Sequence, residues 1–329
     1  MTACPRFNHL LVLPRLQVQN ANAISSPLTH GFPSMTAFLG LIWALERKAR
    51  QAGLDLELNS VGVICHSHQE LVTEEGFIKS FRLTRNPIDK TGSTAAIVEE
   101  GCIHLELSLV LAVQSESWGD KAQQQQDVAQ LIGLLNQMRI AGGVVVPPPQ
   151  PWLRRYQPWV VNQTGSEADM LNEFARSRMR LLPGFALVAR DDLLSQRYQA
   201  MQAVDPTSSR LDAWLSLSRI NWHWQPDEKG SGAWQHDRQG LGWIVPIPVG
   251  YGALSELQPA GSVRNARDQS TDFRFVESLF SIGQWVSPHR LKAAEQLLWY
   301  ADHQPDQGLY RCCNDYQQAT HNGYSYQPE

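Results

Sequence analysis

The sequence predicts an α+β fold, and three patterns of apolar residues carry this prediction. From Ile103 to Val113, apolar residues alternate with polar ones, which is typical of a half-buried strand. The segment from Ser34 to Arg50 has the features of a helix, because Ser34 is a favourable N-cap, basic residues occupy the last turns and Gly53 follows. Shorter apolar runs at residues 10–18, 61–65 and 144–146 predict three more strands.

A second helix is expected over residues 121–139, so the order of elements in the first half of the chain is β-α-β-β-α-β. This order is that of a ferredoxin-like module, the arrangement shared with RNA-recognition domains. Between the second and third strands, residues 77–83 and 94–99 flank the turn-forming segment TRNPIDKTGS. The sequence therefore predicts an inserted hairpin, a thumb, at about 77–99.

The proline-rich segment PPPQPW at residues 147–152 divides the chain, because consecutive prolines continue neither a helix nor a central strand. We expect residues 1–146 to form the ferredoxin-like domain and residues 147–329 to form a second, elaborated half that packs on it. The second half should contain, in order, a basic helix ending in ARSRMRLLPG, a strand GFALVAR, a helical region from Asp191 to about Trp222, a polar loop over residues 226–240, a strand GWIVPIPVG and a final helix that starts at Ser287 and Pro288.

Composition indicates a folded, soluble chain without a membrane span. Of the 329 residues, 43% are hydrophobic and 18% are charged, and no apolar run is long enough to cross a bilayer. The five cysteines are scattered and odd in number, which fits a reducing cytoplasm better than a disulfide framework, and no export signal is readable. A formal net charge of −4 argues against a protein that coats nucleic acid by bulk charge, so any such contact must be local.

The segment from residue 20 to residue 34 is the best indication of function. Asn20, Asn22, Ser25, Ser26 and Thr29 offer many short, neutral hydrogen-bonding groups just ahead of the predicted first helix. The segment has neither a carboxylate pair nor a nucleophile with its base, so it is suited to holding a polar ligand and not to cutting one.

Basic residues gather in three places along the chain. Lys79, Arg82, Arg85 and Lys90 lie in the predicted hairpin, three arginines from 176 to 180 lie at one helix end, and Arg264 and Arg267 flank Asn265. Such groups become phosphate contacts when they flank one groove together with the 20–34 segment. The chain also has eleven tryptophans, of which core packing explains most, and a surplus at the surface would suit stacking on bases or a protein interface.

Catalytic and metal sites find little support in the sequence. His30, His104 and His289 could be general bases of a metal-independent ribonuclease, but ordinary structural roles are favoured for each. The pairs His66 with His68 and Cys312 with Cys313 lack the further ligands of a metal or redox site. No phosphate-binding loop of the GxxxxGK type occurs, so we expect neither a cofactor nor a metal.

Nine segments resemble one protein family over most of the chain: LPRLQVQNANAISSPLTHGFPS, LTRNPIDKTGSTAAIVEEG, RLLPGFALV, GWIVPIPVGY, VRNARD, RFVESLF, SPHR, LLWY and GLYR. They are similar to the second Csy subunit, the Cas-five-type member of the RAMP superfamily in type I-F CRISPR surveillance complexes. The resemblance implies a non-catalytic, RNA-binding role in antiviral defence. It implies that the chain holds the 5′ handle of the CRISPR RNA, forms a heterodimer with the large subunit that reads the PAM, and touches the first backbone subunit through its thumb.

The resemblance also implies that target DNA is reached only indirectly, through guide pairing within the complex. The main alternative is a CRISPR RNA processing endonuclease, because some relatives in the superfamily cut repeat RNA with histidine, and a third possibility is a scaffold that touches only proteins. The residues expected to contact RNA are Asn20, Asn22, Ser25, Ser26, His30, Arg82, Arg85, Asn86, Arg178, Arg180, Arg264, Asn265, Arg267 and Arg290.

Overall fold

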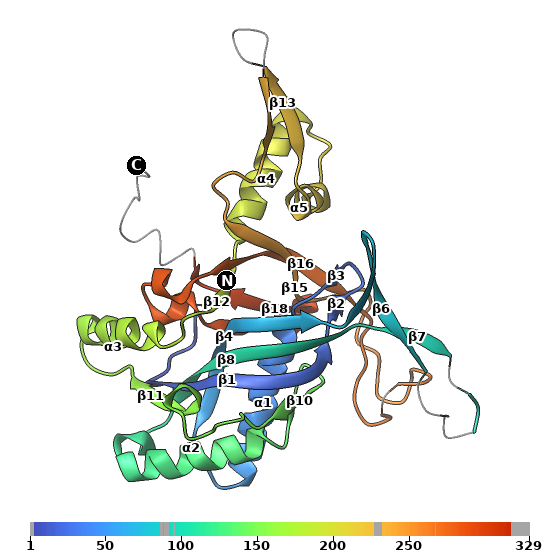
Figure 1. Ribbon diagram of the computed structural model, residues 1–329. Coiled ribbons are helices and arrows are strands. Elements are labelled where there is room, and N and C mark those ends of the chain that lie inside the picture. The colour runs from blue at the N-terminus through green and yellow to red at the C-terminus, as the bar shows by residue number, and fades with distance from the viewer. Residues whose placement is uncertain are drawn as a thin grey trace.

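One large antiparallel sheet joins strands from both halves of the chain (Figure 1). The computed structural model describes residues 3–85, 88, 92–94, 96–226, 232–266 and 268–316. The strands follow the order β12-β16-β15-β18-β17-β4-β8-β1-β10-β9, and β11 pairs with β1 beside this path. Their bounds are β1 His9–Asn22, β4 Glu57–Glu70, β8 Cys102–Gln114, β9 Arg139–Ile140, β10 Gly143–Val146, β11 Trp159–Asn162, β12 Phe185–Ala189, β15 Trp243–Ala253, β16 Val276–Val286, β17 Trp299–Gln304 and β18 Leu309–Asn314.

An additional pairing closes part of this sheet into a ring. Strand β12 pairs with β16 on one side and with β4 on the other, where Phe185 lies opposite Cys65. The strands β4, β12, β16, β15, β18 and β17 therefore return on themselves, and the strands β8, β1 and β10 extend from β4 as an open sheet. A closed ring removes exposed sheet edges and leaves two open mouths.

The central strands of the first half are confirmed and are longer than the sequence predicts. Strand β8 alternates between buried and half-buried residues only as far as Glu106, and from Leu107 to Val113 every residue is buried. Its odd-numbered residues face a core shared with helices α1 (Met35–Gln51) and α2 (Lys121–Leu135), and Val110 and Ala112 face a second core with helix α3 (Glu167–Met179). The strand is thus buried on both faces, because the second half of the chain covers the face expected to be in solvent.

Helix α1 begins as the sequence predicts. The Ser34 hydroxyl oxygen accepts a hydrogen bond from the backbone N–H of Thr36, which satisfies one of the free N–H groups of the first turn. Phe38, Leu39 and Ile42 on its inner face are fully buried against the sheet. The predicted second helix ends earlier than expected, at Leu135, and short strands β9 and β10 follow it.

The insertion between β4 and β8 is a three-stranded unit. Strands β5 (Val72–Glu75), β6 (Ile78–Arg85) and β7 (Ile97–Glu100) pair antiparallel in that order. The predicted hairpin corresponds to β6 and β7, whereas Phe77 lies in the turn that precedes β6, and β5 was not predicted. We call residues 72–100 the insert.

The second half differs from the prediction at several elements. The helical region expected from residue 191 to about 222 is two helices, α4 (Asp191–Val204) and α5 (Arg210–Ser218), and Trp222 already belongs to a strand. The expected polar loop contributes to a hairpin of β13 (Trp222–Pro226) and β14 (Gly232–His236), which projects with α4 and α5 away from the sheet (Figure 1). Strand β16 was not predicted.

The final helix predicted from Ser287 is wrong. A single 3-10 turn, η3 (Pro288–Arg290), is followed by another, η4 (Ala294–Gln296), and then by β17 and β18. The reason is tertiary: Trp299 is fully buried and pairs in register with Val61 of β4, more than two hundred residues earlier. Within the described residues, no helix has the length and apolar character required to cross a membrane.

Candidate nucleic-acid interface

The 20–34 segment leaves the sheet through an irregular end of β1. The register of β1 against β8 shifts between Val18 and Ala21, and Asn20 in this bulge has a φ of 56°. The backbone N–H of Asn20 donates a hydrogen bond to Nδ1 of His104, 3.1 Å away. The Asn20 residue is exposed, and this geometry leaves its side-chain amide available to a ligand.

The remaining polar residues of the segment build a small hairpin of β2 (Ile24–Ser26) and β3 (Thr29–His30). The Asn22 amide both donates to and accepts from the backbone of Ile24. The hydroxyls of Ser25 and Ser26 lie 2.8 and 2.6 Å from the Thr29 hydroxyl oxygen. Much of the hydrogen-bonding capacity of these side chains thus stabilises the hairpin itself, and Ser26 is buried.

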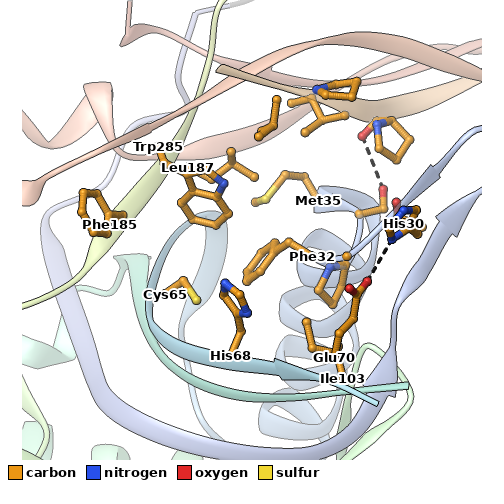
Figure 2. A pocket seen from close by; sticks show the side chains of 18 of the residues that line it. His30, Phe32, Met35, Cys65, His68, Glu70, Ile103, Phe185, Leu187 and Trp285 are labelled. Carbon is orange, nitrogen blue, oxygen red and sulfur yellow. Dashed lines mark hydrogen bonds and ion pairs between the residues drawn. The ribbon is translucent and has the colours of Figure 1, made fainter. Parts of the chain in front are cut away.

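His30 links this hairpin to the insert. Its Nδ1 lies 2.9 Å from Glu70 Oε1 (Figure 2). Its ring also meets the ring of Phe81 edge-on, with the ring centres 5.6 Å apart. Phe81 belongs to β6, and Gly101 at the end of the insert lies so close to Ile24 that a Cβ there would be 2.6 Å from the Ile24 side chain. The hairpin and the base of the insert therefore form one packed unit.

The predicted arginines of the insert are exposed on this unit. Arg82 and Arg85 lie on β6, and within the described part of the chain neither forms an ion pair. Asn86 lies outside the described residues. The loop between β15 and β16 carries the exposed Arg264 and Asn265, the latter with a φ of 62°, whereas Arg267 is outside the described residues. In Figure 1 this loop and the insert extend on the same side of the sheet.

The other predicted arginines lie at the opposite end of the sheet, on and beside α3 (Figure 1). Arg180 caps the C-terminus of α3, and its guanidinium lies 3.6 Å from the centre of the Trp159 ring, a cation–π contact. Partial burial lowers the pKa of both Arg178 and Arg180, and the positive charge of Arg154 lowers that of Arg180 further. The Nε atom of Arg178 is buried without a hydrogen-bond partner among the described residues. Arg290 is exposed on η3, which packs against α3.

The predicted residues therefore form two groups. The first, at the insert end, consists of the described residues Asn20, Asn22, Ser25, Ser26, His30, Arg82, Arg85, Arg264 and Asn265, and the second, at the α3 end, consists of Arg178, Arg180 and Arg290. Within the second group, the guanidiniums of Arg178 and Arg180 are partly desolvated, and neither pairs with a described acid.

A cavity of about 480 Å³ opens next to the β2–β3 hairpin, at one mouth of the closed ring (Figure 2). Its walls are apolar and aromatic, and its rim is polar. Trp243 and Trp285 have ring centres 6.1 Å apart, and Phe32 meets Trp285 edge-on at 5.0 Å. This cavity was not predicted from sequence, because its lining comes from six separate segments of the chain. The alternating prolines of GWIVPIPVG were the one local sign.

A partly buried polar network around His66, which lines the cavity, was also not predicted. Ser108 Oγ accepts a hydrogen bond from the backbone N–H of Arg15 and lies 2.6 Å from Nε2 of His66, and Nδ1 of His66 lies 2.6 Å from the carbonyl oxygen of Pro183. The Arg15 guanidinium pairs with Glu106 at 2.7 Å. Burial lowers the pKa of His66, so this ring is neutral at physiological pH.

The candidate catalytic residues do not form a site. His30 pairs with Glu70, His104 binds the backbone of Asn20, and His289 contacts Ser287, so the three rings lie in three different environments. Burial raises the pKa of Cys65 and of Cys312 to about 12, which leaves both thiols protonated and weakly nucleophilic. Over the described residues, no group of three or more His, Cys, Asp or Glu side chains could hold a metal ion.

Fold and surface together define an α+β protein with a polar hairpin, an insert that carries two exposed arginines, and an aromatic cavity. A sequence model of the family described as CRISPR-associated protein (Cas_Csy2) matches residues 11–312. A relative named CRISPR-associated protein Csy2, from Pseudomonas aeruginosa (strain UCBPP-PA14), is 46% identical over 316 residues, which cover 92% of this chain and 94% of the relative. The chain belongs to the Csy2 family, whose members are subunits of the type I-F Csy complex in CRISPR antiviral defence.

Proposed function

We propose that this chain is a non-catalytic subunit that binds the 5′ handle of the CRISPR RNA and pairs with the large, PAM-reading subunit. The insert then serves as the thumb that contacts the first backbone subunit. Residues 1–146 form a ferredoxin-like RNA-binding module in this proposal, and the order β4-β8-β1-β10 supports it, because these strands correspond to the second, third, first and fourth strands of that motif. Residues 147–329 are the second half, whose strands continue the same sheet.

One observation carries the proposal. The β2–β3 hairpin and the base of the insert pack on one another, so neutral hydrogen-bonding groups and exposed arginines are presented at the same end of the sheet. Single-stranded RNA requires this combination, in which cations contact phosphates while amides, hydroxyls and imidazoles contact bases and sugars.

The α3 group adds a second place for the RNA backbone. Arg178 and Arg180 have no acidic partner among the described residues, and the Trp159 ring beneath Arg180 holds its guanidinium in place. The net charge of −4 is compatible with this proposal, since the basic residues are concentrated locally and the other faces meet proteins.

Binding of labelled repeat RNA to the purified chain, with and without the large subunit, tests the proposal. We expect a complex that weakens as salt rises, with the RNA recovered intact. Cleavage of the repeat would favour the endonuclease, and the combined variant His30→Ala, His104→Ala, His289→Ala should then abolish it. Absence of binding under both conditions would favour a scaffold that touches only proteins.

A further inference from the structure

We propose that the aromatic cavity at the mouth of the ring is a binding site for one unstacked nucleobase of the RNA handle. This inference rests on the proposed RNA-binding function and adds a base-specific site to it. The cavity lies between the end of β4, the strands β12, β15 and β16, and the residues that lead into α1 (Figure 2).

The lining excludes a phosphate as the occupant. Among the described residues that line the cavity there is no lysine or arginine, and the one charged group of fixed sign is the carboxylate of Glu70. Glu70 pairs with His30 at the rim. A phosphate would therefore meet a carboxylate and apolar walls without a counter-charge, which is unfavourable.

The walls are suited to a flat ring. Trp243 and Phe185 stand at the opening with 53% and 43% of their surfaces exposed, and their ring centres are 5.5 Å apart. Trp285 neighbours Trp243, and the buried side chains of Leu187 and Ile247 also line the cavity. Every base has an apolar face that stacks on such rings. An exposed tryptophan beside a cavity presents its own ring face to a base without rearrangement.

The rim supplies neutral hydrogen-bonding groups for the edge of a base. Ser67 and His68 follow Cys65 on β4, and both are exposed at the opening. His30 and Ser25 border it from the β2–β3 hairpin. Imidazole and hydroxyl groups both donate and accept hydrogen bonds, as the edges of nucleobases require.

The position of the cavity also favours RNA over an apolar side chain of a protein partner. Its rim is the same hairpin that packs on the insert, so an RNA strand held by Arg82 and Arg85 passes the opening. The phosphates stay outside, at the arginines, and one base turns inward. The cavity volume of about 480 Å³ lies within the range of sites that hold small planar ligands.

The test uses a series of handle RNAs in which each nucleotide in turn is abasic, bound to the full chain together with the large subunit. Wild-type protein should lose affinity about 5- to 100-fold at one position, the range expected from one aromatic–base stack. Trp243→Ala should bind the intact RNA with an equally reduced affinity. For this variant, the abasic change at the sensitive position should then reduce the affinity by less than about twofold. Trp243→Phe should restore the sensitivity to that position, because it restores an aromatic face.

The matched control is Trp224→Ala, which removes an equally exposed tryptophan on β13, 50% exposed and far from the cavity in the chain's fold. It should bind every RNA of the series as wild type does. The proposal is overturned if each abasic position costs wild type and Trp243→Ala the same, or if Trp243→Ala binds intact RNA normally but fails to join a protein subunit. Salt-sensitive binding of the wild type in those cases would leave the proposed function standing, whereas a wild type that binds no handle RNA would overturn both.

Discussion

At the scale of single residues, the backbone of Asn20 explains why an asparagine occupies this position. Its φ of 56° lies in the left-handed region, which asparagine tolerates better than most residues. The same backbone presents the exposed amide beside the hairpin that we assign to RNA binding. In the proposed function, one side chain serves both the backbone conformation and the RNA contact. A test therefore needs substitutions that remove the amide with and without straining the backbone.

We predict that Asn20→Gly and Asn20→Ala weaken RNA binding alike but differ in stability. Both remove the amide, whereas only alanine is strained at this φ, at a cost of about 1–2 kcal/mol. Thermal unfolding should therefore show a lower midpoint for Asn20→Ala than for Asn20→Gly, and handle affinity measured below both midpoints should fall equally. Unchanged affinity in Asn20→Gly would remove this amide from the RNA site.

The hydrogen-bond partners of His66 fix its tautomer. The carbonyl oxygen of Pro183 only accepts, so Nδ1 of His66 carries the proton, and Nε2 accepts from the hydroxyl of Ser108. The backbone N–H of Arg15 donates to the same hydroxyl oxygen. A proton added to Nε2 would remove the acceptor that the Ser108 hydroxyl uses, and it would place a positive charge near Arg15.

This arrangement predicts loss of stability in mild acid. Burial holds the pKa of His66 below its ordinary value of 6.5, so as the pH falls through that value the unfolded chain takes up a proton that the folded chain does not. The free energy of unfolding should fall as the pH drops through this window. At higher pH His66 is neutral in both the folded and the unfolded chain, so its titration should not affect stability there. His66→Gln keeps a donor and an acceptor without titrating, so its unfolding midpoint should depend less on pH between about 7 and 5.

His9 serves as the reference for this measurement, because burial also lowers its pKa and it remains in the variant. Some pH dependence should therefore persist in His66→Gln. Parallel pH profiles for wild type and His66→Gln would contradict the assignment.

Residues with local partners could be predicted from sequence, and residues with distant partners could not. Ser34 caps its helix through Thr36, two positions away, and the sequence pattern identified it. Ser25 and Ser26 were correctly placed in a polar segment ahead of that helix, but their bonds with Thr29 decide how much capacity remains for a ligand. His66 binds Pro183 across 117 positions, which no local pattern encodes.

At the scale of elements, the insert carries more apolar surface than a free-standing sheet can keep in water. Phe77, Ile78, Leu83 and Ile97 are all more than half exposed. Small sheets without a covered face are marginally stable, and exposed apolar patches mark surfaces that meet a partner. The proposed contact with the first backbone subunit would bury this apolar surface.

We predict that shortening the insert prevents assembly without unfolding the protein. In the register of β6 with β7, Arg85 lies opposite Ile97, so a two-residue Asn-Gly turn in place of residues 86–96 closes the hairpin at that pair. The buried residues of β4 and β8 are not altered by this replacement, so the unfolding midpoint should stay near that of wild type. Co-purification of all subunits with guide RNA should recover the backbone without this chain.

The matched control for the insert is the β13–β14 hairpin, where Pro226 lies opposite Gly232. Replacing residues 227–231 by Asn-Gly makes the same kind of change on another projecting hairpin. This control should assemble fully. Full assembly of the shortened insert would show that the docking element lies elsewhere.

Elements also show where sequence patterns were misleading. Ser287 and Pro288 form a good helix start, and they do begin a turn, but the residues after them enter the sheet because Leu297, Leu298 and Trp299 are buried against it. The alternation of β8 predicted one buried face, and the second half of the chain buries the other. Local signals mark the start of an element, whereas long-range pairing decides whether the chain continues as helix or strand.

At the scale of the whole molecule, the closed ring accounts for the position of the cavity. Strand β12 joins the ring to the first half through its pairing with β4, so residues from both halves meet at one mouth. Sequence could predict the separate strands of the first half and the polar 20–34 segment. It could not predict the cavity, because each wall depends on long-range pairing. Trp243 lies opposite Trp285 in the β15–β16 pair, and the pairing of β12 with β16 and with β4 adds Phe185 and the end of β4.

The two groups of arginines at opposite ends of the sheet lead to a prediction about the path of the nucleic acid. Each lost phosphate contact reduces the slope of log affinity against log salt by roughly one unit or less. Arg82→Ala with Arg85→Ala and Arg178→Ala with Arg180→Ala should each reduce that slope. The combined variant should show the sum of the two effects, because the two groups lie far apart and no described residue pairs with both.

Arg176→Ala is the control, since Arg176 is exposed on α3 and already pairs with Glu173 at 3.4 Å. It should change neither affinity nor slope measurably, because exposed pairs of this kind contribute little. A slope reduced only by the insert variants would confine the RNA to the end that carries the β2–β3 hairpin and the cavity. Affinity lost at α3 with an unchanged slope would instead assign Arg178 and Arg180 to packing around Trp159.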